Sequence, residues 1–209
     1  MVLRVLLASM LMGLTTSIAF AGILLEPYLG KSLNGKGDTE YELLGLKFPY
    51  KHSYDSITYG GRVGADIQKV QFGVDYSMQN FSLESEYSGA KGKDKVAKTQ
   101  TGVFLGYGPQ PWLRIWGLYI FESEVEGKDP LNAAASVQFV YDQIKFSKGG
   151  GYGIGVGLMP NQYISINIEY RAIEYDEETI RGLTVTNMTN KFDLSELLVS
   201  VSLPFIVLK

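Results

Sequence analysis

The sequence predicts an all-β fold, an eight-stranded antiparallel up-and-down transmembrane β-barrel that follows a cleaved N-terminal signal peptide. Three observations lead to this prediction. The chain opens with an export signal. The rest of it alternates apolar and polar residues in segments of about ten residues, which is long enough for a tilted strand to cross a bilayer. The connections between these segments are alternately short and long.

The start of the chain has the three parts of a secretory signal peptide. Arg4 supplies the positive charge, Val5 to Leu14 is apolar, and Ala19-Phe20-Ala21 is the small-x-small pattern that signal peptidase recognises. The apolar run is well short of the roughly 20 residues that a membrane-spanning helix needs. We therefore expect cleavage after Ala21, so that residues 1–21 are the signal peptide and residues 22–209 form the barrel.

The composition excludes several classes of protein. The chain has no cysteine, so it can form neither disulfides nor thiolate metal sites. Its formal net charge of −3 gives no basic face for nucleic acid. After the signal peptide no apolar run approaches the roughly 18 residues of a transmembrane helix. The abundant glycine, tyrosine and phenylalanine suit either a strand-rich membrane protein or a soluble β-sandwich, and the pattern of strands and connections has to separate the two.

The first three strands are expected where every second residue is apolar. The first covers Ile23–Leu33, and the second and third cover Ile57–Ile67 and Val70–Met78. Only Gln68-Lys69 separates the second strand from the third, which is the length of a hairpin turn. These segments predict one strand followed by one hairpin.

The fourth and fifth strands form the next expected hairpin. They cover Thr99–Tyr107 and Trp112–Glu124, and Gly108 to Pro111 supply turn residues between them. The fifth strand has the least certain register, because the apolar Leu118 and Ile120 would share its inward face. A bulge or a reversed register would resolve this.

The last three strands show the clearest alternation. Gly149–Met159 places glycine opposite apolar residues, and a short turn leads to Tyr163–Tyr175, where isoleucines alternate with polar residues. Leu197–Phe205 closes the series. The short connections follow strands two, four and six. The long ones are the other four: Asn34–Ser56, Gln79–Lys98, Val125–Lys148 and Asp176–Asp193. An even strand number with this alternation is typical of outer-membrane barrels, whereas a sandwich has no reason to sort its loops in this way.

The expected inward face carries charges of both signs. An eight-stranded barrel has an interior that its own side chains just fill. The inward charged residues, four acidic and three basic, are Glu26, Arg62, Asp66, Asp75, Arg114, Glu169 and Arg171. Balanced charge favours a paired network that closes the lumen, and a narrow solute path is the alternative. The glycines of the sixth strand leave space inside, which Tyr28, Trp112 and Trp116 could fill.

No catalytic, cofactor or metal site is expected. His52 lies beside Ser53 and near Asp55, but neighbouring loop residues rarely adopt productive geometry, so we expect a solvated histidine. Glu174 to Glu178 could attract Ca²⁺, although a solvated acidic loop is the simpler interpretation. Ala133 to Phe146 is unusually apolar for a loop and could extend strands, cap the mouth or form an adhesive surface.

Three segments carry a resemblance to a known family. Gly149 to Arg171, Pro27 to Gly30 and Leu197 to Phe205 resemble the small OmpA/OmpX-like outer-membrane β-barrel (porin-family) proteins. The resemblance implies that the barrel-assembly machinery recognises the last strand through its alternating apolar and terminal aromatic residues. These residues are Leu197, Val199, Val201, Leu203 and Phe205. The chain departs from the family pattern because four residues follow Phe205.

The expected function follows from these features. We expect a monomeric, non-enzymatic protein of the bacterial outer membrane with a largely plugged lumen and four surface loops in structural or recognition roles. A narrow channel for small or apolar solutes is the first alternative, and a lipid-modifying enzyme is the second. The expected partners are outer-membrane lipids, lipopolysaccharide and the assembly machinery, and the ligand of the loops is unknown.

Overall fold

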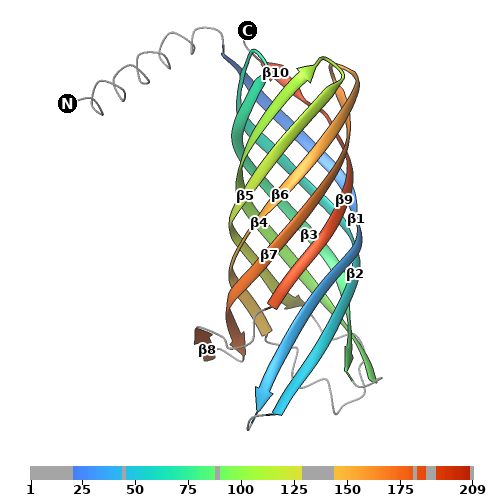
Figure 1. Ribbon diagram of the computed structural model, residues 1–209, viewed down its shortest axis with the longest axis vertical. Coiled ribbons are helices and arrows are strands. Elements are labelled where there is room, and N and C mark those ends of the chain that lie inside the picture. Colours follow the sequence, from blue (N-terminus) through green and yellow to red (C-terminus); the bar gives the residue numbers. More distant parts are fainter. Residues whose placement is uncertain are drawn as a thin grey trace, which may run out of the picture.

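The computed structural model describes residues 21–43, 46–87, 90–128, 144–180, 183–186 and 192–207, and these residues form strands and tight turns. The long strands wrap around one axis as a closed antiparallel barrel (Figure 1). The expected signal peptide lies outside the described residues except for Ala21, where β1 begins. None of the described residues forms a helix that is long and apolar enough to cross a membrane.

Eight long strands make the wall of the barrel. They are β1 (Ala21–Leu43), β2 (Leu46–Ile67), β3 (Val70–Tyr87), β4 (Ala90–Gln110), β5 (Leu113–Lys128), β6 (Ile144–Asn161), β7 (Ile164–Ile180) and β9 (Phe192–Ser202). Each pairs with the next along the chain, and β9 pairs with both β7 and β1, which closes the sheet. This arrangement confirms the predicted eight-stranded up-and-down barrel.

Two short strands complete the sheet. After Pro204, β10 (Phe205–Val207) continues along the start of β1, so that the residues beyond Phe205 still pair with the barrel. At the other end, β8 (Leu183–Thr186) turns back along β7. The start of β1, β10 and the short turns lie at one end of the barrel, and the long hairpins lie at the other (Figure 1).

The expected length of the strands was wrong. The wall strands contain 11 to 23 residues, because most of the segments expected as long loops continue the ladder. Residues 35–43 pair with residues 46–54, and residues 79–87 pair with residues 90–98. In these extensions the outward residues are polar, as at Lys36, Asp55 and Glu84, so the row of apolar outward residues ends although the strand does not. The connection 129–143, which contains most of the apolar segment Ala133–Phe146, lies outside the described residues.

The fifth strand contains a bulge. Thr101 pairs with Glu122 but Gly102 pairs with Ile120, so Phe121 is an extra residue in β5. Before the bulge Leu118 and Ile120 are inward and buried, and after it the inward residues are odd-numbered, beginning with Ser123. Two bulky residues beside a glycine-lined β6 therefore face inward without conflict. Trp112, expected as an inward filler, instead lies exposed on the turn before β5.

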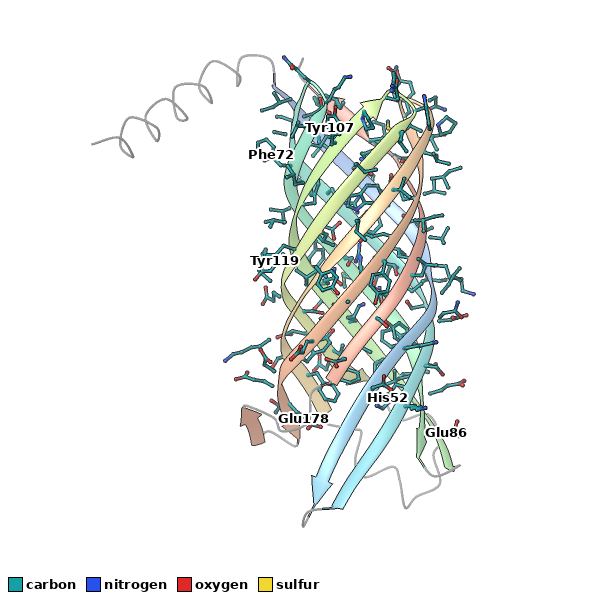
Figure 2. All side chains as sticks on the ribbon, viewed as in Figure 1. His52, Phe72, Glu86, Tyr107, Tyr119 and Glu178 are labelled. Carbon is teal, nitrogen blue, oxygen red and sulfur yellow. The ribbon has the colours of Figure 1, made fainter. Side chains whose placement is uncertain are left out.

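An apolar band surrounds the barrel at the short-turn end and along its middle. Phe72, Tyr107 and Tyr119 project from the outer wall into this band (Figure 2). The exposed aromatic residues of the wall include Tyr107, Tyr163 and Phe205 toward the short turns, and Tyr59, Tyr76 and Phe121 toward the long hairpins. We call the part of the barrel inside this band the belt section. The part beyond it, toward the long hairpins, is the hairpin section.

Candidate functional site: the barrel interior

The interior changes character along the barrel axis, and β7 illustrates this. In the belt section its inward residues are Ser165, Asn167, Glu169 and Arg171, and its outward residues are Ile164, Ile166, Ile168 and Tyr170. In the hairpin section the inward residues become Ile173 and Tyr175, while Asp176 is exposed on the outside. Both faces thus invert at the same height, although the alternation itself continues.

Arg62 lies at the centre of the polar interior. Its Nε donates to Asp75 Oδ2 at 3.0 Å, and its Nη2 donates to Glu169 Oε2 at 2.5 Å. The guanidinium also lies 4.5 Å from the centroid of the Trp116 ring. Glu26 Oε1 is 3.8 Å from Arg62 Nη1. One buried cation is therefore shared among three carboxylates, at charge-assisted hydrogen-bond distance from two of them.

Two further arginines complete this network. Arg114 forms a bidentate pair with Glu26 through both of its terminal nitrogens. Arg171 donates to Glu169, and its Nη1 donates to Ser77 at 2.9 Å. Each carboxylate thus has an arginine partner, as groups buried away from water require.

The seven inward charged residues of the sequence analysis all line the interior and are all buried. Six of them, all except Asp66, form the network around Arg62. Asp66 lies nearer the short-turn end and accepts a hydrogen bond of 2.8 Å from Gln71 Nε2, while Gln71 Oε1 accepts one from Arg114. Asp66 therefore joins the network through an amide.

Trp116 occupies the space that the glycines of β6 leave. A Cβ placed on Gly155 would lie 2.3 Å from Trp116 Cε2, so no larger residue fits there unless the indole moves. The indole Nε1 donates to Glu169 Oε2 at 2.6 Å, which satisfies its only polar atom. Glycine on one strand and tryptophan on the next thus fill the lumen together.

A second ion pair lies toward the hairpin section, and the sequence analysis missed it. Lys98 Nζ is 2.7 Å from Glu196 Oε1, and both side chains are almost fully buried. Gln79 Nε2 donates to the same carboxylate at 2.9 Å. Lys98 and Gln79 were expected in a long loop, and Glu196 immediately precedes the expected last strand. The alternation of Glu196 with Leu198 and Ser200 is the signal that would have found it.

Beyond this pair most of the buried side chains are apolar. Aromatic and aliphatic side chains from all eight wall strands except β1 meet there: Tyr54, Phe81, Leu83, Val96, Val125, Phe146, Ile173, Tyr175, Phe192 and Leu194. The Phe146 and Phe192 rings are 4.2 Å apart between centroids, and the Tyr54 and Phe81 rings are 4.3 Å apart. These contacts form a hydrophobic plug on the hairpin side of the charged network.

His52 belongs to this plug, so its expected exposure to solvent was wrong. The residue is 7% exposed, and its ring meets Phe192 edge-on at 5.6 Å. Burial lowers its pKa to about 4, although the charge of Asp38 opposes this shift. Ser53 and Asp55 are exposed on the opposite face of β2, where Asp55 pairs with Lys31. The three residues therefore cannot act as a catalytic triad.

The acidic segment of β7 does not gather at one point either. Glu178 is buried and Asp176 is exposed, because successive residues of a strand point to opposite faces. Glu177 pairs with Lys148 at 2.7 Å. No group of three or more metal-binding side chains occurs within the described residues. The calcium site considered for this segment is therefore not formed by its described side chains.

Gln100 lies where the two kinds of interior meet. Its cross-strand neighbours are Ser77, which accepts from Arg171, and Ser123, which bonds to Tyr175. The amide itself is 1% exposed, and neither its nitrogen nor its oxygen has a hydrogen-bond partner among the described residues. The junction thus contains a polar group at an energetic cost.

Comparisons with known proteins agree with this architecture. The family model described as "outer membrane protein beta-barrel domain" matches residues 6–205. The crystal structure of the outer membrane protein OprG from Pseudomonas aeruginosa is similar, with a TM-score of 0.55 and 13% identity over 89% of this chain and 97% of that one. Neisserial surface protein A gives a TM-score of 0.48 and 16% identity over 88% and 99%. No curated protein matches the sequence.

Proposed function

Because the chain belongs to the outer membrane protein beta-barrel domain family, we propose that it is a closed, non-enzymatic barrel that holds surface-exposed hairpins in a fixed arrangement. It is an integral protein of the bacterial outer membrane. In such barrels the short turns lie in the periplasm and the longer connections outside the cell. The belt section then lies in the bilayer, and the hairpin section projects from the cell surface.

Closure at two levels is the observation that carries this proposal. In the bilayer the lumen is occupied by the network around Arg62 and by Trp116, which packs against that guanidinium. Outside the bilayer it is occupied by the cluster around Phe192. An ion crossing the barrel would have to break buried salt bridges and then enter an apolar core, and both steps are costly.

The arrangement of polar side chains supports a non-enzymatic role. Among the described residues the only histidine is His52, which is packed against Phe192 inside the barrel. Of the inward serines, Ser202 is hydrogen-bonded to Glu26 and Ser123 to Tyr175. A serine nucleophile needs an adjacent base and access to substrate, and these residues provide neither.

The long hairpins suit the display of a surface for recognition. β1 and β2 remain paired up to Leu43 and Leu46, past Thr39, where β9 begins its pairing with β1. This hairpin therefore projects beyond the closed wall, at the lower end of Figure 1. A ladder that continues from the barrel as far as Leu43 and Leu46 fixes the direction in which these two strands project.

The last strand is proposed as the signal for the assembly machinery. Leu197, Val201, Leu203 and Phe205 are exposed on its outer face, and Val199 between them is half-buried. This row lies in the band that meets lipid, and its final part pairs with the start of β1. Strand closure and an exposed apolar row therefore coincide at the end of the chain. We propose that the protein is assembled as a monomer, since one chain closes the sheet.

Conductance in planar bilayers tests the proposal. We expect no current steps from the wild-type protein. We also expect none from Trp116→Ala or Phe192→Ala alone, because the first variant makes space only in the belt section and the second only in the hairpin section. The double variant should conduct. The control is the faster migration of unheated protein than boiled protein in a detergent gel, which shows that each variant has folded. Conduction by the wild-type protein, or equal conduction by a single and the double variant, would contradict closure at two levels.

A further inference from the structure

The outer wall is hollowed where the belt section meets the hairpin section. A groove of about 550 Å³ crosses β1 to β4 at this height. Lys31 and Lys95 stand at its rim, and Ile57, Phe81, Ser82 and Val96 also line it. Phe81 and Val96 belong to the inner face of the barrel and are among the apolar residues that line the groove. We call this hollow the β1–β4 groove.

Strand pairing is irregular beside the hollow. The register of β1 against β2 shifts between Ser32 and Gly35, and Asn34 between them has a positive φ of 52°. Beside it, the β2–β3 ladder is interrupted between the pairs formed by Ser53 and Ser56. Such irregularities bend a strand away from its neighbour. The groove therefore coincides with the irregular part of the β1–β3 ladder.

The groove is open to the lipid-facing surface on one side. Ile57 is 62% exposed and belongs to the apolar band, next to Tyr59 on the same strand. Tyr59 accepts a hydrogen bond of 3.1 Å from Asn80, a further lining residue. The apolar surface of the belt section thus continues into the groove on the side of the hairpin section, at the height where acyl chains give way to headgroups.

The rim carries a net positive charge. Lys31 Nζ is 3.3 Å from Asp55 Oδ2, and both side chains remain more than half exposed. No ion pair of Lys95 is found within the described part of the chain. Lys31 and Lys95 against Asp55 leave an excess of one positive charge. An exposed lysine near a membrane surface attracts anionic headgroups.

A second groove at the same height shows that this charge is local. It has about 470 Å³ and is lined by Tyr152 and Tyr170, whose exposed rings mark the edge of the apolar band on β6 and β7. Its charged residues are one lysine and three carboxylates: Lys36, Asp38, Glu174 and Asp193. Both grooves meet the membrane edge, but only the β1–β4 groove suits an anion.

We propose that the β1–β4 groove binds a phosphorylated, acylated lipid of the outer leaflet. The phosphate lies between Lys31 and Lys95, and an acyl chain runs from the groove over Ile57 into the bilayer. This assigns the binding of outer-leaflet lipid to one face of the barrel. The inference rests on the outer-membrane location and the shape of the wall, and it does not depend on whether the lumen conducts.

Native mass spectrometry of the folded protein in uncharged detergent, titrated with bis-phosphorylated lipid A, tests the proposal. The variant K31Q/K95Q should bind at least about tenfold more weakly, because it loses both cations. Ser82→Trp keeps every charge and fills the groove, so it should also weaken binding. The matched control is K51Q/K145Q, which removes two lysines that do not line the groove. It should bind as the wild-type protein does.

Two further probes identify the chemistry. Lipid A without phosphates and inorganic phosphate alone should each bind much more weakly than the intact lipid. The proposal is overturned if the dephosphorylated lipid binds equally well, since the lysines would then have no role. It is also overturned if inorganic phosphate binds as tightly as the intact lipid. The same holds if K31Q/K95Q and K51Q/K145Q bind lipid A with equal affinity. Heat-dependent gel mobility verifies that every variant is folded.

Discussion

The belt section and the hairpin section are built from the same strands with opposite distributions of polarity. On β2, the belt section places Arg62 inside and Val63 outside, whereas the hairpin section places Tyr54 inside and Asp55 outside. On β9, Ser200 and Val201 contrast in the same way with Leu194 and Asp193. Strand pairing continues through both sections.

The difference shows that the external solvent decides which face is apolar. Where lipid surrounds the barrel, apolar residues face outward, and the interior can hold charges only because a closed network pairs them. Where water surrounds it, apolar residues gain by facing inward, as in any soluble protein. The height at which both faces invert therefore marks the membrane boundary. The β1–β4 groove lies at this height.

The largest expected effect comes from removing a charge in the belt section. Arg62→Leu removes the cation that Glu26, Asp75 and Glu169 share, and Arg171 is then the remaining partner of Asp75 and Glu169. Breaking a buried ion pair from one side typically costs about 3–5 kcal/mol, and we expect a loss of about 4 kcal/mol. Urea unfolding in lipid vesicles, followed by tryptophan fluorescence, measures it.

An exposed ion pair serves as the control for that prediction. Lys31→Leu removes the partner of Asp55, but both groups are solvated, so the free energy of unfolding should change by about 0–1 kcal/mol. Equal effects of Arg62→Leu and Lys31→Leu would contradict the difference in burial on which the comparison depends.

A smaller effect is expected in the hairpin section when the pH is lowered. Burial holds the pKa of His52 at about 4, below its usual 6.5, so the folded protein keeps this ring neutral. Between pH 7.5 and 5 His52 becomes protonated in the unfolded chain but stays neutral in the folded protein. The free energy of unfolding therefore falls as the pH falls. The expected loss is about 2 kcal/mol.

Unfolding measured at several pH values tests this prediction for the wild-type protein and for His52→Leu. The variant cannot take up this proton in either state, so its stability should change less over the same range. Parallel pH profiles for the two proteins would show that His52 is not kept neutral by the apolar plug.

The sequence was informative wherever lipid imposes the alternation. It predicted the strand order and the closed barrel, since both depend on residues that alternate between lipid and lumen. For β5 it left a bulge or a reversed register open, and the structure has the bulge. The sequence failed for the extended hairpins and for the pair of Lys98 and Glu196. There water replaces lipid outside, so charged outward residues such as Glu84 and Asp193 are typical of loops as well as of strands. The position of His52 was missed for the same reason.

The smallest expected effect lies at the junction, and its sign is the informative part. Gln79 and Gln100 are both 1% exposed, but Gln79 bonds to Glu196 and Ser56, whereas no partner of Gln100 is found within the described residues. Gln100→Leu should therefore stabilise the barrel by about 1 kcal/mol, because it removes two unpaired polar atoms from a region that is already apolar on one side.

Gln79→Leu is the matched control and should destabilise by about 1–3 kcal/mol, because it deprives a buried carboxylate of a donor. Urea unfolding of the two variants under identical conditions decides the matter. Changes of the same sign would show that the polar interior extends past Gln100, so that the boundary between the two sections would have to be drawn further along the hairpins.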